Sequence, residues 1–234
     1  MVSFVPCRFA VNSTEDQGPD PISALLRGAR TFREREYGGG ATLMRRLSSG
    51  QQPRVLMIAC ADSRVDPALI FDARPGDLLM VRQAANLVPP PGDERIGSAV
   101  MSAVELGLKA LRIPNLIVCG HSHCAGVRTA LERAAGNIQP EDSRLHDWTA
   151  VAEPACREVI AEHGGASSDE LACHAEQRSI LKSLENLRAH TWLRDLEAAG
   201  EVTLHGWWFD IATGHLWIAD PETGEFAPAS YRQT

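Results

Sequence analysis

The sequence lacks an excess of positive charge and lacks any long apolar segment. Its 234 residues include 23 Lys and Arg against 30 Asp and Glu, a formal net charge of −7. Because nucleic-acid-binding proteins usually present a basic face, we expect no nucleic-acid partner. The longest apolar runs, such as Val55 to Ala61, are far too short to span a bilayer. We therefore expect no membrane association.

Cysteine is also sparse. Six cysteines in 234 residues are too few for a disulfide scaffold, and no C-x-x-C pair is present. The missing pair argues against a thioredoxin motif or a zinc ribbon. The first ten residues lack the basic start and long apolar core of a signal peptide. These absences predict a cytoplasmic protein whose reduced thiols are available for a metal or for catalysis.

What is present is typical of a globular domain, with 44% hydrophobic and 23% charged residues. Residues 1–20 are expected to form a flexible lead-in, because their second half is rich in Ser, Thr, Asp, Gly and Pro. Residues 21–234 are expected to form one domain. It begins with a helix that has apolar residues at helical spacing and arginines between them, and that ends at Gly38–Gly40. A second short helix is expected at 43–47.

Three short apolar runs, at 54–59, 78–81 and 116–119, predict strands buried on both faces. Helical patterns at 96–111 and from Cys124 to about Ala135 alternate with them. This alternation predicts an α/β fold with a central, mostly parallel β-sheet flanked by helices.

The second half of the chain begins with two long helical patterns, at 146–162 and 169–196, the first interrupted by Pro154. Two β-like segments then follow, at 202–210 and 216–219, separated by a Thr-Gly turn. They predict a C-terminal hairpin.

Two polar loops follow predicted strands, at the position where parallel α/β sheets bind ligands. One contains Cys60, and the other contains His121 and Cys124. Together these residues form a Cys₂His set, which would leave the fourth tetrahedral position of a zinc ion open, as in catalytic zinc sites. Taken singly they have plainer interpretations, since Cys60 could be a small buried hydrophobe and a His-x-x-Cys spacing arises often by chance.

Asp62 and Arg64 lie two residues apart on the first loop. A carboxylate beside a guanidinium stays ionised and can be held in one orientation. Asp62 could accept a hydrogen bond from a zinc-bound hydroxide, or become the fourth ligand and close the site. An ion pair that only fixes the loop is the plainer alternative.

The loops at 60–64 and 121–124 resemble those of the β-class carbonic anhydrases. The similarity also covers residues 75–77, 81–90, 176–187 and 204–207, and runs from about Ile22 to about Ala219. The resemblance implies one zinc ion per chain, held by Cys60, His121 and Cys124, with Asp62 and Arg64 as the catalytic dyad. It further implies that Gln51, nine residues before Cys60, binds bicarbonate in the pocket of a partner subunit.

The same resemblance implies the reversible hydration of carbon dioxide to bicarbonate and a proton by attack of zinc-bound hydroxide. It implies a homodimer or homotetramer in which residues 21–50 form a helical arm on the neighbouring subunit. Some bacterial members hold inhibitory bicarbonate with a tryptophan, an arginine and a tyrosine. Here only the arginine is matched, by Arg82, and Met57 and Phe209 occupy the positions of the tryptophan and the tyrosine. We therefore expect no inhibitory bicarbonate site and an open zinc site.

Two alternatives remain open from the sequence. Relatives on this scaffold hydrolyse carbonyl sulfide or carbon disulfide, and the ligand set alone does not separate these substrates from carbon dioxide. A non-catalytic zinc-binding protein, closed permanently by Asp62, would use the same residues. The sequence argues against a thiol phosphatase. That chemistry needs an arginine six residues after the cysteine, and Ala130 occupies this position after Cys124.

Overall fold

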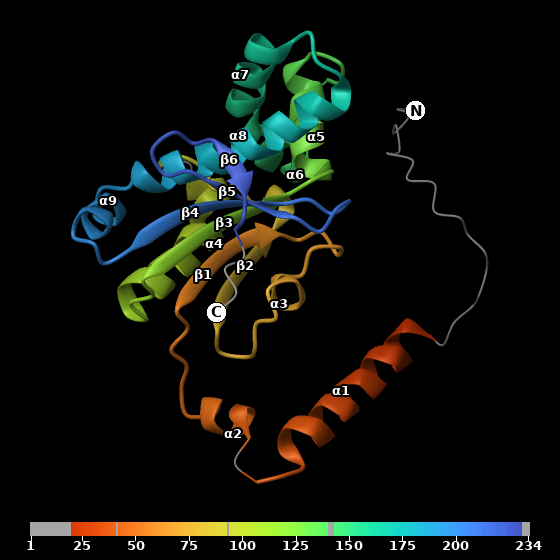
Figure 1. The fold of residues 1–234 in the computed structure, drawn as a ribbon, viewed down its shortest axis with the longest axis vertical. Coiled ribbons are helices and arrows are strands. Elements are labelled where there is room, and N and C mark those ends of the chain that lie inside the picture. Colours follow the sequence, from red (N-terminus) through yellow and green to blue (C-terminus); the bar gives the residue numbers. More distant parts are fainter. Residues whose placement is uncertain (1–19, 41, 93, 140–142, 231–234) are drawn as a thin grey trace. The chain divides into compact units, whose positions relative to one another are not determined.

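The computed structural model describes residues 20–40, 42–92, 94–139 and 143–230 (Figure 1). The predicted lead-in, residues 1–20, lies outside this range apart from Asp20. The chain divides into two compact units, 1–50 and 51–234, and each is described by itself. In the part of the chain that the structure describes, no helix is long and apolar enough to cross a membrane.

The first unit contains the two expected helices, α1 (Pro21–Tyr37) and α2 (Leu43–Leu47). Helix α1 begins where the Asp20 carboxylate accepts the backbone N–H of Ser23 at 2.9 Å, with proline in its first turn. None of its residues is buried. Ile22, Leu25 and Leu26 are 63, 71 and 68% exposed, so α1 carries an apolar face without a partner in its own unit.

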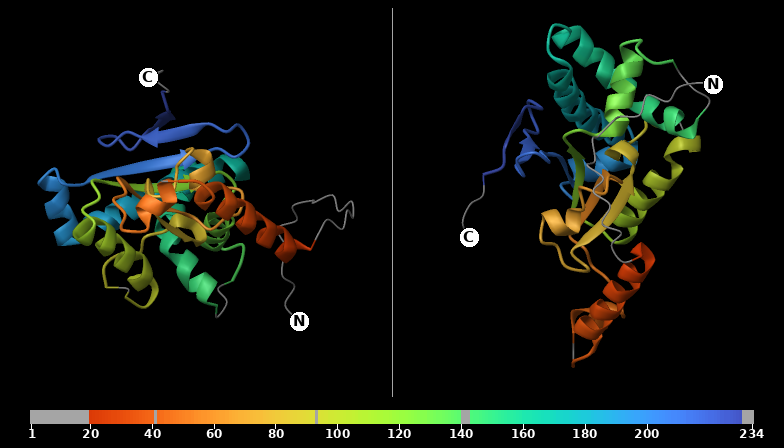
Figure 2. Two further views of the ribbon diagram at one scale, coloured as in Figure 1. Left: turned by 90° about the horizontal axis from the view of Figure 1, so that it is seen from below. Right: turned by 90° about the vertical axis from the view of Figure 1, so that its right-hand side faces the viewer.

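The second unit is built on a six-stranded sheet in the order β2-β1-β3-β4-β5-β6. The strands are β1 (Val55–Cys60), β2 (Leu78–Gln83), β3 (Asn115–His121), β4 (Thr203–Phe209), β5 (Leu216–Ala219) and β6 (Phe226–Pro228). Strands β1 to β4 pair in parallel, which confirms the predicted α/β architecture. Strand β4 pairs antiparallel with β5 as the expected hairpin, and the unpredicted β6 extends it at the sheet edge (Figure 2).

Seven helices are described in this unit: α3 (Pro67–Ile70), α4 (Glu94–Glu105, continued by a π-helical turn, Leu106–Ala110), α5 (Ala125–Ala134), α6 (Arg144–Thr149), α7 (Glu153–His163), α8 (Ser168–Arg188) and α9 (Thr191–Ala198). Pro154 does interrupt the pattern at 146–162, because it lies in the first turn of α7. The single helix predicted at 169–196 is wrong, since it breaks into α8 and α9. His190 adopts an extended conformation there, and the break lets both Leu187 and Leu193 be fully buried.

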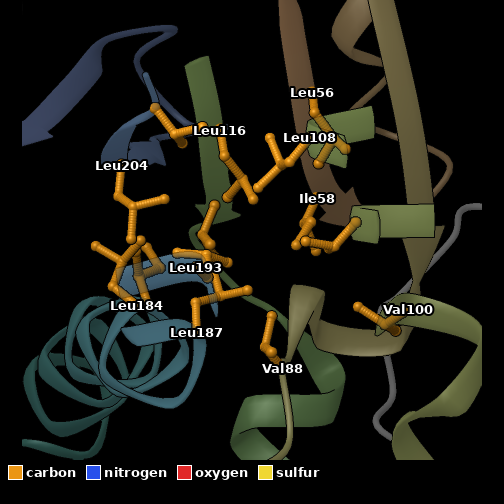
Figure 3. Close-up of a cluster of buried hydrophobic side chains, with 14 of the residues drawn as sticks. Leu56, Ile58, Val88, Val100, Leu108, Leu116, Leu184, Leu187, Leu193 and Leu204 are labelled. Atoms are coloured by element: carbon orange, nitrogen blue, oxygen red, sulfur yellow. The ribbon is translucent and has the colours of Figure 1, made fainter. Parts of the chain in front are cut away.

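The main core lies between one face of the sheet and helices α4, α8 and α9 (Figure 3). Leu56 and Ile58 from β1 and Leu116 from β3 are fully buried there. The alternate residues of these strands, Met57 and Ile117 among them, are buried in a smaller cluster. Both sets are buried because β1 and β3 are interior strands of a parallel sheet, as their continuous apolar runs predict. Their carboxyl ends therefore meet at one edge.

Candidate metal centre

The structure brings the three predicted ligands together at that edge. Cys60 ends β1, His121 ends β3, and Cys124 is the N-cap residue of α5. Their ligand atoms lie within 4.8 Å of one another, and no other group of three or more such residues is found among the described residues. All three side chains are buried.

His121 is oriented for a metal by its neighbour. Its Nδ1 lies 2.8 Å from the carbonyl oxygen of Ser122, a contact that requires the proton on Nδ1. Its Nε2 is buried without a conventional hydrogen-bond partner in the part of the chain described. Metal-ligating histidines typically donate their second ring N–H in this way, which leaves the other nitrogen's lone pair for the ion.

The two thiols lie against each other. The pKa of Cys60 is lowered, chiefly because the Cys124 thiol donates to it, while the pKa of Cys124 is raised by the same contact and by burial. The Cys60 sulfur also accepts the backbone N–H groups of Asp62 and Ala85, at 3.4 and 3.3 Å. Thiolate sulfur and imidazole nitrogen are preferred ligands of zinc, so the set fits a zinc ion with one position open.

The Asp62 carboxylate lies in a fork formed by Arg64. The guanidinium donates to Oδ1 from Nε at 2.9 Å and to Oδ2 from Nη2 at 2.7 Å, and the Arg64 backbone N–H also reaches Oδ1. Mainly because of the Arg64 side chain, the pKa of Asp62 is lowered to about 2. Asp62 is therefore a carboxylate at neutral pH with both oxygens held in place.

From the sequence, Arg82 entered only as the one matched residue of the inhibitory bicarbonate site, whereas the structure places it against the ligand loop. From β2 it donates to the carbonyl oxygens of Cys60, Asp62 and Val65 at 3.1, 2.8 and 3.2 Å. It also pairs with Asp66 at 3.0 Å. The loop that carries the dyad is thus fixed through its backbone.

Cys60 and Asp62 line a pocket of about 240 Å³ whose walls are mainly apolar. The other lining residues are Ala61, Ala84, Ala85, Cys124, Ala125, Gly126, Thr129, Leu145 and Thr149. The wall at Ala85 is strained, because this residue has a φ of +61°, in the left-handed region. Gln51 is exposed and is not among the described residues that line its own chain's pocket. The pocket suits a small, weakly polar molecule.

A buried carboxylate that sequence reasoning missed lies behind the ligands. Glu176 of α8 is 3% exposed and accepts the Cys124 backbone N–H at 3.0 Å and the Trp208 indole N–H at 3.1 Å. Burial raises its pKa to about 7, against the lowering effect of these two hydrogen bonds. Its spacing in the sequence could have identified it. Glu176 lies one helical turn from Ala172 and one from Ile180, so it falls on the same buried face of α8 as these apolar residues.

Comparisons with known proteins agree with this geometry. A family model described as carbonic anhydrase matches residues 55–216. A carbonic anhydrase of Synechocystis sp. is 35% identical over 210 residues, covering 89% of this chain and 75% of that protein. The chloroplastic β-carbonic anhydrase 5 of Arabidopsis thaliana is 32% identical over 194 residues, 81% of this chain and 62% of that protein.

Among solved structures, that of the β-carbonic anhydrase CcaA is similar with a TM-score of 0.82 and 33% identity. The match covers 90% of this chain and 100% of that chain. Sequence, fold and ligand cluster lead to one assignment: the chain belongs to the β-class carbonic anhydrases, which are zinc enzymes.

Proposed function

We propose that this chain catalyses the reversible hydration of carbon dioxide to bicarbonate and a proton, with one zinc ion held by Cys60, His121 and Cys124. The observation that carries the proposal is the cluster of two thiols and an imidazole beneath an apolar pocket, next to an ionised carboxylate. When bound, zinc supplies the Lewis acidity that makes a water molecule nucleophilic near neutral pH.

Asp62 orients that attacking water by accepting a hydrogen bond from it. Arg64 keeps the carboxylate ionised and directed, because it binds both carboxylate oxygens. The same fork opposes rotation of Asp62 toward the ion, which supports an open fourth coordination position.

The pocket walls act on the substrate. Alanine methyl groups and Leu145 give carbon dioxide an apolar surface, and the charged product is bound weakly there. Gln51, exposed in its own chain, is proposed to donate a hydrogen bond to bicarbonate in the pocket of a neighbouring subunit.

Oligomerisation is proposed from the arm, residues 21–50. Its helix α1 exposes Ile22, Leu25 and Leu26, and an apolar face of this kind favours burial against a partner. The arm also carries six arginines and two glutamates, whereas the whole chain has a net charge of −7. The positive charge of the arm and its exposed apolar side chains therefore both favour binding to a second, acidic copy of this chain. Such binding would form a homodimer or a homotetramer.

The alternative functions are not favoured. Three relatives that match, from Synechocystis sp., Synechococcus elongatus and Arabidopsis thaliana, are named carbonic anhydrases, which argues against a hydrolase of carbonyl sulfide or carbon disulfide and against a non-catalytic zinc protein. A cytoplasmic location stays a prediction, because the Arabidopsis relative is named chloroplastic.

Stopped-flow measurement of carbon dioxide hydration, with zinc stoichiometry on the same sample, tests the proposal. Cys124→Ser should lose zinc and activity together, because one of the three protein ligands is weakened. Asp62→Asn should keep zinc and lose most of the activity, since the amide presents a donor in place of one carboxylate acceptor. An active protein free of metal would refute the scheme.

A further inference from the structure

We propose that Glu176 is a positioning residue, which fixes the backbone of Cys124 and thereby slows the loss of zinc. The proposal rests on the proposed metal site. It concerns a residue of α8 that accepts a hydrogen bond from the main chain of the ligand loop, 52 residues away in the sequence.

The carboxylate bridges two elements that form the site. Oε1 accepts the N–H of Cys124, the N-cap residue of α5, and Oε2 accepts the indole N–H of Trp208 on β4. Among the described residues, no lysine or arginine lies within ion-pairing distance of Glu176. Its position is therefore set by these two donors.

The chemistry of the two contacts requires a carboxylate. Both groups that face Glu176 are N–H donors, and only a carboxylate presents an acceptor to each. A glutamine has one oxygen, so its NH₂ group would face one of the two donors. Burying a carboxylate costs free energy, and a residue needed only for packing here would be apolar, like its neighbours Ala172 and Ile180.

The contact also lies where a backbone change would reach the metal. Cys124 carries its thiol on the same residue whose N–H Glu176 holds, directly before the first turn of α5. Loss of an outer partner of a metal ligand typically costs about 10–100-fold in metal affinity.

The matched control is Ser183, also on α8 and 2% exposed. Its hydroxyl accepts the backbone N–H of Val88 at 3.1 Å, so Ser183→Ala likewise removes a buried acceptor for a loop N–H, away from the ligands. Trp208→Phe removes the second donor and leaves the Cys124 contact in place.

Zinc transfer from the loaded full-length protein to a chromogenic chelator measures the effect. Glu176→Gln should release zinc about 10-fold faster or more, and Ser183→Ala should stay near the unmodified rate. Trp208→Phe should give a smaller increase than Glu176→Gln, because it removes one of the two donors that set the position of Glu176. Glu176→Asp keeps two acceptor oxygens on a shorter side chain, so it should recover part of the difference. With cobalt(II) in place of zinc, Glu176→Gln should shift the visible absorption bands, and Ser183→Ala should not.

The positioning role would be overturned if Glu176→Gln released zinc at the same rate as Ser183→Ala and left the cobalt(II) absorption bands unchanged. If Glu176→Gln does not fold, Glu176→Asp decides: zinc release at the unmodified rate overturns the role, and faster release than from Ser183→Ala supports it. An unmodified chain that binds no zinc would refute the proposed function instead, so the two failures are distinguishable.

Discussion

The guanidinium of Arg64 donates a hydrogen bond to the backbone carbonyl of His123 at 3.1 Å, although the two residues are 59 positions apart. His123 has a φ of +58°, a left-handed conformation rarely adopted by residues other than glycine. Since the same guanidinium holds Asp62, the dyad on the first loop is tied to the loop that carries His121 and Cys124. His123 contributes through its main chain to the orientation of the dyad.

Arg64→Lys should lower kcat/KM for carbon dioxide hydration by about 100-fold while zinc content stays unchanged. An ammonium group does not reproduce the fork, so Asp62 would lose its fixed orientation. Stopped-flow kinetics and metal analysis measure both quantities. Arg74→Lys is the control, because Arg74 pairs with Asp77 on the surface at 3.7 Å. Unchanged kinetics for Arg64→Lys would show that the fork does not orient Asp62.

The Asp62–Arg64 pair should stabilise the fold in a pH-dependent way. The pKa of Asp62 is about 2 in the fold, below the ordinary value of 3.8 for an aspartate, so the pair's contribution to stability is complete above the unfolded pKa. It is lost as pH falls through the folded pKa. The difference in unfolding free energy between the unmodified chain and Asp62→Asn should therefore be constant from neutral pH to about pH 5 and shrink below it. A difference that grows on acidification would contradict this assignment.

Gly126→Ala should distort the pocket wall. A Cβ at this position would lie 2.8 Å from the Cβ of Ala85, in a turn that is already strained. We expect a loss of about 1–3 kcal/mol in unfolding free energy, together with reduced activity. Chemical denaturation and carbon dioxide hydration assays measure both effects. Gly165→Ala is the control, since its Cβ meets nothing within 4 Å; equal behaviour of the two variants would show that the wall adapts.

Removal of zinc should make Cys60 the most reactive thiol of the five described cysteines. Its pKa is lowered by hydrogen bonds, whereas burial raises the pKa of Cys119 and Cys156 to about 12. Iodoacetamide at neutral pH should therefore label Cys60 first in the metal-free protein, as read by peptide mass spectrometry. Zinc should protect it. Equal labelling of Cys60 with and without zinc would argue against Cys60 as a ligand.

Leu25→Asp should dissociate the proposed oligomer. Leu25 is 71% exposed on α1, and a carboxylate there would oppose burial against a second copy. Sedimentation velocity should show a smaller species than for the unmodified chain. Leu69→Asp, at a leucine of α3 that is 83% exposed, is the control for a surface change outside the arm. An unchanged sedimentation coefficient for Leu25→Asp would exclude this face of α1 from the interface.

Part of the fold could be predicted from local patterns. The apolar runs at β1 and β3 identified interior strands, because only strands covered on both faces are apolar at every position. The break between α8 and α9 was not predicted, since the residues around His190 continue a helical pattern. The break serves the burial of Leu187 and Leu193, which depends on the core rather than on neighbouring residues.

The sequence alone determined the set of predicted metal ligands, which the structure brings into one cluster. Cys60 ends one parallel strand and His121 ends its neighbour, with Cys124 three residues further on. Parallel strands bring their carboxyl ends to one edge of the sheet. Only the tertiary structure decided which contacts hold these groups in place. Arg82 donates to the carbonyl of Asp62 on the first loop, and Arg64 donates to the carbonyl of His123. Glu176 accepts the backbone N–H of Cys124. Those contacts join residues 20 to 59 positions apart, so they depend on how strands and helices pack, which a local pattern does not record.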